Sequence, residues 1–232
     1  LDLQSSSING YIPSEFGLLI NLKKLVLHNN ELVGSIPSEI GLLKKMEGIR
    51  AGNNYLTGTI PSEILLPNQL TLILDSNKFN GTIPSEIGLL SQVKNINMQR
   101  NKLSGVIPSE IGLLKPNLKT LYLSENQLQG SIPSELGLLN QALNLEIASN
   151  DLEGSIPTEI GLLVKVTTLS LKHNDFSGTI PSQFGQLTRL SNLYLSYNKK
   201  LTVPNTLCEV KQNGVIHASD TKVVCECCDN SS

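Results

Sequence analysis

The chain has 232 residues, of which 39% are hydrophobic and 16% are charged, so it can bury a core and does not have the composition of a disordered protein. The formal net charge of −2 argues against dependence on nucleic acid or anionic lipid, and neither is expected as a partner. No apolar run approaches the roughly 18 residues of a membrane span, and no signal sequence is present, so this segment itself is expected to make no membrane contact. Leu1-Asp2-Leu3 already has the pattern of a strand, so we expect a piece of a longer protein that lacks its N-terminal cap.

Proline and glycine recur with a nearly constant period. Eight of the 11 prolines follow an isoleucine, at intervals of 24, 24, 23, 24, 25, 24 and 24 residues. They are Pro13, Pro37, Pro61, Pro84, Pro108, Pro133, Pro157 and Pro181. A fixed period of this length predicts a solenoid, in which each unit buries its apolar side against its neighbours. The chain is therefore expected to form one elongated array.

The first part of each period predicts a short strand followed by a buried amide. In the second unit, Leu25 and Leu27 alternate with other residues, as in a strand that directs its leucines inward. An asparagine follows three residues after the second leucine in eight units, where its amide can satisfy backbone groups left unpaired as the strand turns away. This predicted structural ladder contains Asn30, Asn54, Asn77, Asn101, Asn126, Asn150, Asn174 and Asn198.

The second part of each period predicts an extended segment and a helical turn. Gly34 permits a tight backbone, and Pro37 presets the first turn of a short helix, expected to be of the 3₁₀ type. Glu39 suits the positive end of that turn, and Gly41 is expected to let the chain leave it. The core of this unit is expected to be filled by Ile40, Leu42 and Leu43.

The complete pattern, Leu-x-x-Leu-x-Leu-x-x-Asn-x-Leu-x-Gly-x-Ile-Pro, resembles the plant-type leucine-rich repeat family, including algal members. It covers residues 1–204, as eight full units and a partial ninth. The resemblance implies an α/β solenoid: a right-handed superhelix with a parallel β-sheet on the concave side, short flank strands, and 3₁₀ turns on the convex side. In this family such arrays are usually ectodomains of receptor-like kinases or receptor-like proteins, or secreted enzyme inhibitors.

Three units depart from the pattern. The third has Leu65-Leu66-Pro67-Asn68 where glycine is expected and is one residue short, so its convex turn should be rebuilt. The fifth carries an extra residue near Pro116. The ninth, Asn198 to Pro204, lacks the glycine, as a closing unit would.

The segment 205–232 changes in character and contains all four cysteines: Cys208, Cys225, Cys227 and Cys228. A solenoid must cover its last apolar turn, so we interpret the segment as a disulfide-stabilised C-terminal cap formed in an oxidising compartment. Four cysteines allow three pairings, and a bond from Cys208 to one of the other three is favoured over one between adjacent cysteines. A zinc site is the alternative, although the spacing lacks the usual gaps between ligands. N-glycosylation sequons begin at Asn80 and Asn230.

No catalytic, cofactor or metal site is expected. His28 and His173 are expected six strands apart, and His217 lies in the tail without a carboxylate at a telling spacing. No catalytic or phosphate-binding motif is present. The Pro-Ser-Glu triplets place a carboxylate in each of seven units from Glu15 to Glu159. A cation-binding ridge is one interpretation of them, and solvated charges at helix starts are the favoured one.

Function is expected on the outward residues of the strands, which the core does not dictate. Tyrosine and arginine are the residue types that most often anchor interfaces. The candidate ligand-binding residues are Tyr122, Glu146, Lys172, His173, Tyr194, Tyr197, Arg50 and Arg100, with four of them expected to cluster near the C-terminal end. Peptide receptors of the family often use an Arg-x-Arg pair, which this chain lacks, because Arg50 and Arg100 are expected two strands apart.

The leading hypothesis is a non-catalytic extracellular or cell-surface module that recognises a protein or peptide ligand, possibly with a co-receptor, as part of a receptor-like protein. A secreted, polygalacturonase-inhibitor-like inhibitor of cell-wall-degrading enzymes is the alternative. A third hypothesis is a surface that binds ice or a polysaccharide, because Ser or Thr precedes Ile-Pro in six of eight units. Those residues are Ser35, Thr59, Thr82, Ser131, Ser155 and Thr179, with interruptions at Tyr11 and Val106.

Overall fold

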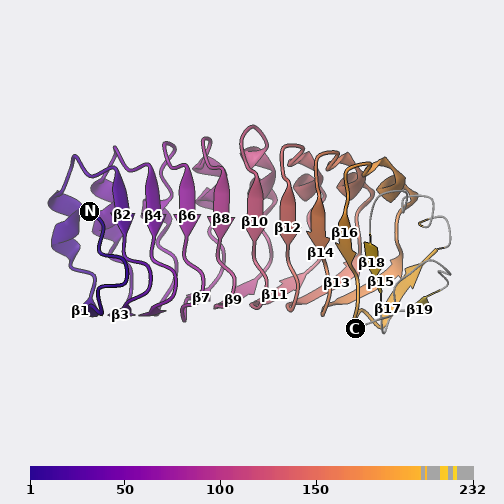
Figure 1. The fold of residues 1–232 in the computed structure, drawn as a ribbon, viewed down its shortest axis with the longest axis horizontal. Helices are drawn as coiled ribbons and strands as arrows, with labels where there is room; N and C mark the ends of the chain where they lie inside the picture. The colour runs from indigo at the N-terminus through magenta and orange to yellow at the C-terminus, as the bar shows by residue number, and fades with distance from the viewer. Residues whose placement is uncertain (205–206, 208–214, 219–221, 224–232) are drawn as a thin grey trace.

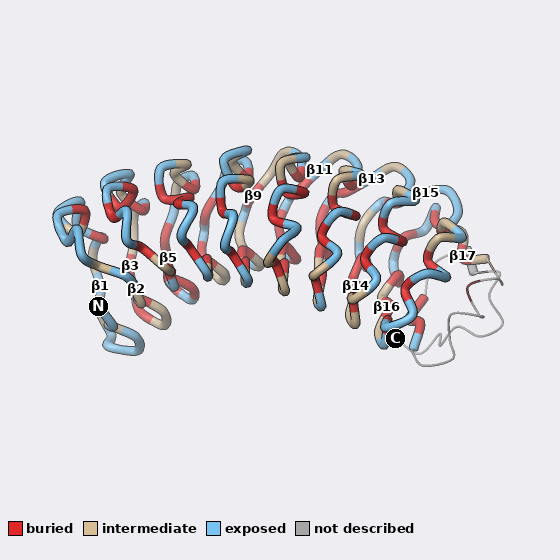
Figure 2. The backbone as a smooth tube through the Cα atoms, turned by 90° about the horizontal axis from the view of Figure 1, so that it is seen from above, coloured by how far each residue is buried: buried red, intermediate tan, exposed pale blue. Residues whose placement is uncertain are grey.

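The computed structural model describes residues 1–204, 207, 215–218 and 222–223, and these form one row of stacked turns (Figure 1). The row curves into an arc, with a nine-stranded parallel sheet on its inner, concave side (Figure 2). The strands of this sheet are β2 (Lys24–Val26), β4 (Gly48–Arg50), β6 (Thr71–Ile73), β8 (Asn95–Asn97), β10 (Thr120–Tyr122), β12 (Asn144–Glu146), β14 (Thr168–Ser170), β16 (Asn192–Tyr194) and β18 (Val215–His217). The predicted solenoid is confirmed.

A second row of parallel strands forms the flank. It consists of a three-stranded sheet and a seven-stranded sheet. The first contains β1 (Asn9–Tyr11), β3 (Glu31–Gly34) and β5 (Tyr55–Leu56). The second contains β7 (Asn80–Gly81), β9 (Lys102–Gly105), β11 (Gln127–Gly130), β13 (Asp151–Ser155), β15 (Asp175–Thr179), β17 (Lys200–Val203) and β19 (Lys222–Val223).

Each turn is completed by a 3₁₀ helix that begins directly after the repeated proline. The eight helices are η1 (Ser14–Leu18), η2 (Ser38–Leu42), η3 (Ser62–Ile64), η4 (Ser85–Leu89), η5 (Ser109–Leu114), η6 (Ser134–Leu138), η7 (Thr158–Leu162) and η8 (Ser182–Gln186). Between these helices and the sheets, one apolar cluster runs through every turn, from Ile12 to Ala218. The hydrophobic core therefore extends along the whole described array and is not concentrated at one central point.

The two irregular units change their helices but not the concave strands, and the flank is interrupted between β5, in the third unit, and β7. The short third unit has the shortest of the eight helices, η3, and it buries Leu65 and Leu66 in place of the missing glycine turn. The fifth unit, with its extra residue, has the longest helix, η5. The concave strands on either side keep their register, since β4 pairs with β6 and β8 with β10 as in the other units. Changes in length are thus absorbed on the convex side.

Each repeat has two glycine positions, one in the flank strand and one in the 3₁₀ helix, and glycine is required at them for different reasons. Gly105 adopts φ +72°, a conformation that favours glycine, and a Cβ there would lie 2.8 Å from the Thr82 methyl group of the preceding turn. Gly41 has no such backbone angle, but a Cβ there would lie 2.5 Å from the Glu63 carbonyl oxygen of the next turn. The prediction that Gly41 lets the chain leave its turn is therefore wrong, because this glycine is required by the close stacking of successive helices.

The predicted core of the helical turn needs one correction. Ile40 and Leu43 are fully buried, whereas Leu42 is 56% exposed. The equivalent leucines of other helices are also exposed, because a 3₁₀ helix of this length can turn only one side toward the core. In the Ile-Gly-Leu-Leu motif, the isoleucine and the second leucine thus belong to the core, and the first leucine lies on the surface.

Both sheets continue past residue 204. Strand β18 pairs with β16 in the concave sheet, and β19 pairs with β17 on the flank. Ile216 and Ala218 are buried in the core cluster. The described part of the 205–232 segment therefore adds a further turn to the array. The four cysteines and Asn230 lie outside the described residues.

Candidate ligand-binding surface

The concave sheet fixes the direction of its side chains by alternation. In each three-residue strand the central residue is buried, as Leu145 is in β12, while its two neighbours face outward. The strands pair in a constant register, so outward residues form straight columns across the sheet. One column contains, on successive strands, Tyr122, Glu146, Ser170, Tyr194 and His217.

A further row of surface residues follows three positions after each of these. Its members have positive φ angles of 52° to 61°, so they belong to a left-handed turn and not to the strand. The row contains Ser5, Asn29, Asn53, Ser76, Arg100, Glu125, Ser149, His173 and Tyr197. Alternation predicts a third outward column at these positions, and the structure instead presents these side chains at the edge of the concave face.

Two aromatic stacks lie toward the C-terminal end of the array, one on the left-handed turns at the edge of the concave face and one on its strands. The rings of His173 and Tyr197 are 4.0 Å apart at an interplanar angle of 13°, and those of Tyr194 and His217 are 4.6 Å apart at 8°. The Lys172 Nζ atom lies 5.8 Å from the centre of the Tyr194 ring, within cation–π range. We call these five residues the aromatic cluster. Its rings are held against their neighbours before any partner binds.

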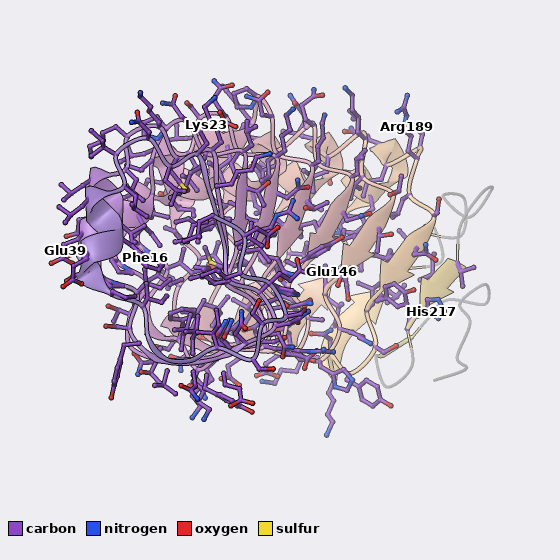
Figure 3. The ribbon with its side chains drawn as sticks, turned by 60° about the vertical axis from the view of Figure 1, so that its left-hand side comes forward. Phe16, Lys23, Glu39, Glu146, Arg189 and His217 are labelled. Carbon is purple, nitrogen blue, oxygen red and sulfur yellow. The ribbon has the colours of Figure 1, made fainter. Side chains whose placement is uncertain are left out.

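Glu146 borders the aromatic cluster from β12 and is half-buried in the concave face (Figure 3). Burial raises the pKa of its carboxyl group, and the positive charge of Lys172 partly opposes this effect. The carboxylate is thus held in a place where its charge is incompletely compensated. A donor from a partner would stabilise that charge.

A separate hollow of about 400 Å³ occupies the N-terminal half of the same face. It is lined by Gln4, His28, Arg50, Thr71, Ile73, Asn95, Asn97, Thr120 and Tyr122. Among the described residues Arg50 forms no ion pair, whereas Arg100 is paired with Glu125 at 3.0 Å. Arg50 is therefore the available guanidinium of this hollow.

His28, which lines the hollow, packs closely over Gly52 of the next turn. A Cβ at Gly52 would collide with the Asp75 carboxylate and would lie 2.8 Å from His28 Nδ1. The Nδ1 atom is buried and forms no hydrogen bond within the described structure. The absence of a side chain at position 52 thus leaves room for the His28 imidazole and the Asp75 carboxylate, which come from the turns on either side of it.

The eight predicted ligand-binding residues therefore do not form one site. Lys172 lies near Tyr194 and Glu146 on the concave face, and His173 stacks on Tyr197 at its edge. Tyr122 and Arg50 line the hollow. Arg100 lies at the edge with its own carboxylate partner. His217 was not predicted to belong here, although Val215-Ile216-His217 has the outward–inward–outward pattern of every other concave strand.

The remaining predictions concern a glycosylation site, a metal site and a membrane-spanning helix. The side chain of Asn80 is exposed at the start of β7. The described residues contain no group of three or more His, Cys, Asp or Glu side chains placed to hold a metal ion. The same part of the chain contains no helix long and apolar enough to cross a bilayer.

Comparisons with known proteins agree with this geometry. A parallel solenoid with a rigid concave sheet defines a class of repeat proteins that bind partners, and a family model described as "Leucine Rich Repeat" matches residues 21–43, 92–114, 117–139 and 165–187. The chain belongs to the leucine-rich repeat family, and its repeats are of the plant type. A search among curated proteins gave no significant match.

Three solved structures illustrate the likeness. The leucine-rich repeat ectodomain of the Arabidopsis thaliana membrane receptor kinase GASSHO1/SCHENGEN3, solved with CASPARIAN STRIP INTEGRITY FACTOR 2, is 34% identical over 96% of this chain and 30% of its own, with a TM-score of 0.88. The Arabidopsis receptor kinase HAESA was solved in complex with the peptide hormone IDA and the co-receptor SERK1. It is 33% identical over 96% of this chain and 37% of its own, with a TM-score of 0.91. A plant ice-binding protein is 27% identical over 94% of this chain and 70% of its own, with a TM-score of 0.78.

The chain spans about a third of the length of the two receptor structures. What it shares with them is the fold of receptor and binding proteins, which are generally not catalytic. Ligand recognition is the function this fold supports.

Proposed function

We propose that the chain is the ligand-recognition part of an extracellular receptor-like protein and that it binds a protein or peptide through the concave face. The observation that carries the proposal is the aromatic cluster, in which two stacked ring pairs and a lysine are ordered in advance. Preordered aromatic side chains lose little entropy on binding, and such residues dominate the energy of many interfaces. The similarity to receptors solved with peptide ligands supports the same reading.

Binding combines the two regions of the face. The aromatic cluster offers flat apolar surface and donors, and Glu146 accepts a hydrogen bond or a positive charge from the partner. The hollow around Arg50 lies on the same sheet, so an extended chain that crosses the strands reaches both. Outside the cell, the exposed Asn80 on the flank is available for N-glycosylation without covering the concave face.

The test uses a random linear peptide library displayed on phage and selected against the 232-residue chain. Enriched peptides are measured on the wild type, on the variant Lys172→Ala/Tyr194→Ala/Tyr197→Ala, and on the control Tyr11→Ala/Tyr55→Ala. The control removes two exposed tyrosines of the flank and leaves the concave face intact. We expect the first variant to bind at least about tenfold more weakly and the control to bind like the wild type.

The proposal fails if no peptide is enriched, or if the enriched peptides bind both variants equally. Circular dichroism and thermal unfolding of both variants establish that they are folded. A folded concave variant with unchanged affinity would place the binding surface elsewhere.

Ice binding is a second candidate, favoured by the similarity to the plant ice-binding protein. The six Ser and Thr residues before Ile-Pro are all exposed along one line of the flank. Exposed Tyr11 and Val106 interrupt the line. A regular row of hydroxyl and methyl groups on a flat sheet is the feature that such binding would use.

Ice recrystallisation is the test of this second function. We expect inhibition by the wild type and its loss in Thr59→Tyr/Thr82→Tyr, which breaks the line at two neighbouring turns. Activity equal to that of albumin at the same concentration rejects the function.

A further inference from the structure

Positive charge is concentrated along one edge of the array. The eight loops between each 3₁₀ helix and the next concave strand hold eight of the 18 lysines and arginines, but only one of the 20 acidic residues, Glu47. The cations are Lys23, Lys44, Lys45, Lys94, Lys115, Lys119, Lys165 and Arg189. We call this row of loops the basic edge. Lys23 and Arg189 mark its two ends in Figure 3, and their side chains project along the same border.

The acidic residues of the repeat lie elsewhere. Glu39 and its equivalents begin the 3₁₀ helices, on the convex side of the array (Figure 3). In six of the seven units a neighbouring hydroxyl donates to this carboxylate, as Thr158 Oγ1 does to Glu159 at 3.1 Å. A molecule with a net charge of only −2 therefore has one edge at which cations greatly outnumber carboxylates.

The cations of the basic edge are poorly neutralised within the described structure. The described residues form three ion pairs, and one of these lies on the basic edge: Lys23 with Glu47 at 3.1 Å. Lys119 and Lys165 both donate to the same neutral oxygen, Gln141 Oε1, at 3.5 and 2.7 Å. Two ammonium groups, from the turns on either side of Gln141, therefore converge on its amide, which holds them in place but supplies no counter-charge.

We propose that the basic edge binds a linear polyuronate, an acidic polysaccharide with one carboxylate per sugar. The edge offers on average one cation per turn, with none in the third and sixth loops and two each in the second and fifth. Turns repeat at about 4.8 Å, so its charges form a long row. Exposed Asn21, Gln92 and Asn140 lie between the cations and can pair with sugar hydroxyls. The loops contain no aromatic residue on which a nucleic-acid base could stack.

This surface is separate from the concave face, so its function does not depend on the ligand proposed above. A cell-surface protein that holds an acidic wall or matrix polymer along one edge keeps its concave face free for another partner. The failure of one proposal therefore leaves the other standing.

The experiment measures binding of sodium alginate to the complete chain, with dextran as the neutral polymer and poly(dT) as the nucleic-acid polyanion. The test variant is Lys115→Gln/Lys119→Gln/Lys165→Gln. The control variant, Lys78→Gln/Lys102→Gln/Lys199→Gln, has the same net charge but changes cations outside the basic edge. We expect the test variant to bind alginate at least about tenfold more weakly and the control to stay within about twofold.

Raising the salt concentration from about 0.05 to about 0.3 M should weaken wild-type binding, since the charges are exposed. The proposal is overturned if alginate does not bind, if dextran binds equally, or if both variants lose affinity alike. Binding of poly(dT) as tight as that of alginate would also overturn it. Sedimentation that shows the chain polymerised through this edge without alginate would assign the surface to a second copy.

Discussion

The asparagine ladder and the outward columns of the concave face run through the same turns but follow different rules. All eight asparagines make the same contacts: the amide nitrogen donates to carbonyls of its own turn and of the preceding turn, and the amide oxygen accepts a backbone N–H. In contrast, the outward column contains Tyr122, Glu146, Ser170 and Tyr194 on consecutive strands. The ladder is uniform and the surface is variable.

The difference has a physical cause. Buried backbone groups must find partners inside the protein, and only an amide of this length reaches three carbonyls and one N–H at each turn. Most outward side chains keep contact with water in the free protein, so the packing of the core places little demand on them. A leucine-rich repeat array can therefore vary its binding surface without altering the stack that supports it.

The sharpest way to break the ladder is Asn126→Ala. Asn126 Nδ2 donates to the carbonyl oxygens of Met98 and Leu123, both at 3.0 Å, and Oδ1 accepts from the Leu103 N–H at 3.0 Å. Because these backbone groups are buried, we expect the free energy of unfolding to fall by about 1–3 kcal/mol, measured by urea denaturation.

The control for this substitution is Asn140→Ala. Asn140 is an exposed asparagine outside the ladder, so a change within about 0.5 kcal/mol is expected. Equal effects of the two substitutions would contradict the bonding role of the ladder.

A smaller effect tests the stacking of the helices. Gly41→Ala would place a methyl group 2.5 Å from the Glu63 carbonyl oxygen, and we expect a loss of about 1–2 kcal/mol in thermal or urea unfolding. The equivalent Gly185, in η8, has no atom of the described residues within 4 Å of its Cβ position. Gly185→Ala should therefore be neutral or slightly stabilising. Identical losses at both positions would show that glycine acts through backbone freedom instead.

The smallest effect concerns the surface itself. Because burial raises the folded-state pKa of Glu146, the folded protein binds a proton more readily than the unfolded chain, and stability falls as pH rises through that interval. Glu146→Gln should therefore raise the free energy of unfolding near pH 7, by less than about 1 kcal/mol. The gain should vanish at about pH 3, well below the ordinary glutamate pKa, where the carboxyl group is protonated in both states. A gain that is independent of pH would assign the effect to packing.

Much of the fold followed from spacing alone. The period of Ile-Pro and glycine predicted the solenoid, and the positions of Leu25, Leu27 and Asn30 predicted an inward strand and a buried amide. The third and fifth units were identified as irregular from their lengths. These predictions succeed because each unit meets only its immediate neighbours, so that local pattern and tertiary contact coincide.

The site was less predictable. Spacing placed Tyr194, Tyr197, Lys172 and His173 near one another, yet it did not indicate that the rings stack in two pairs or that Arg100 is paired with Glu125. His217 was overlooked because its segment lacks the repeat pattern, although its strand completes the concave sheet. Leu42 was misassigned because hydrophobicity does not show which side of a short helix faces the core.

The amino-acid sequence by itself determined the stack: its period, its inward leucines and its amide ladder, since these depend on contacts that repeat identically between adjacent turns. The tertiary structure alone decided which surface residues meet. Side chains from different turns come together only when the strands are in register and the array has its curvature, and neither property is encoded within one repeat.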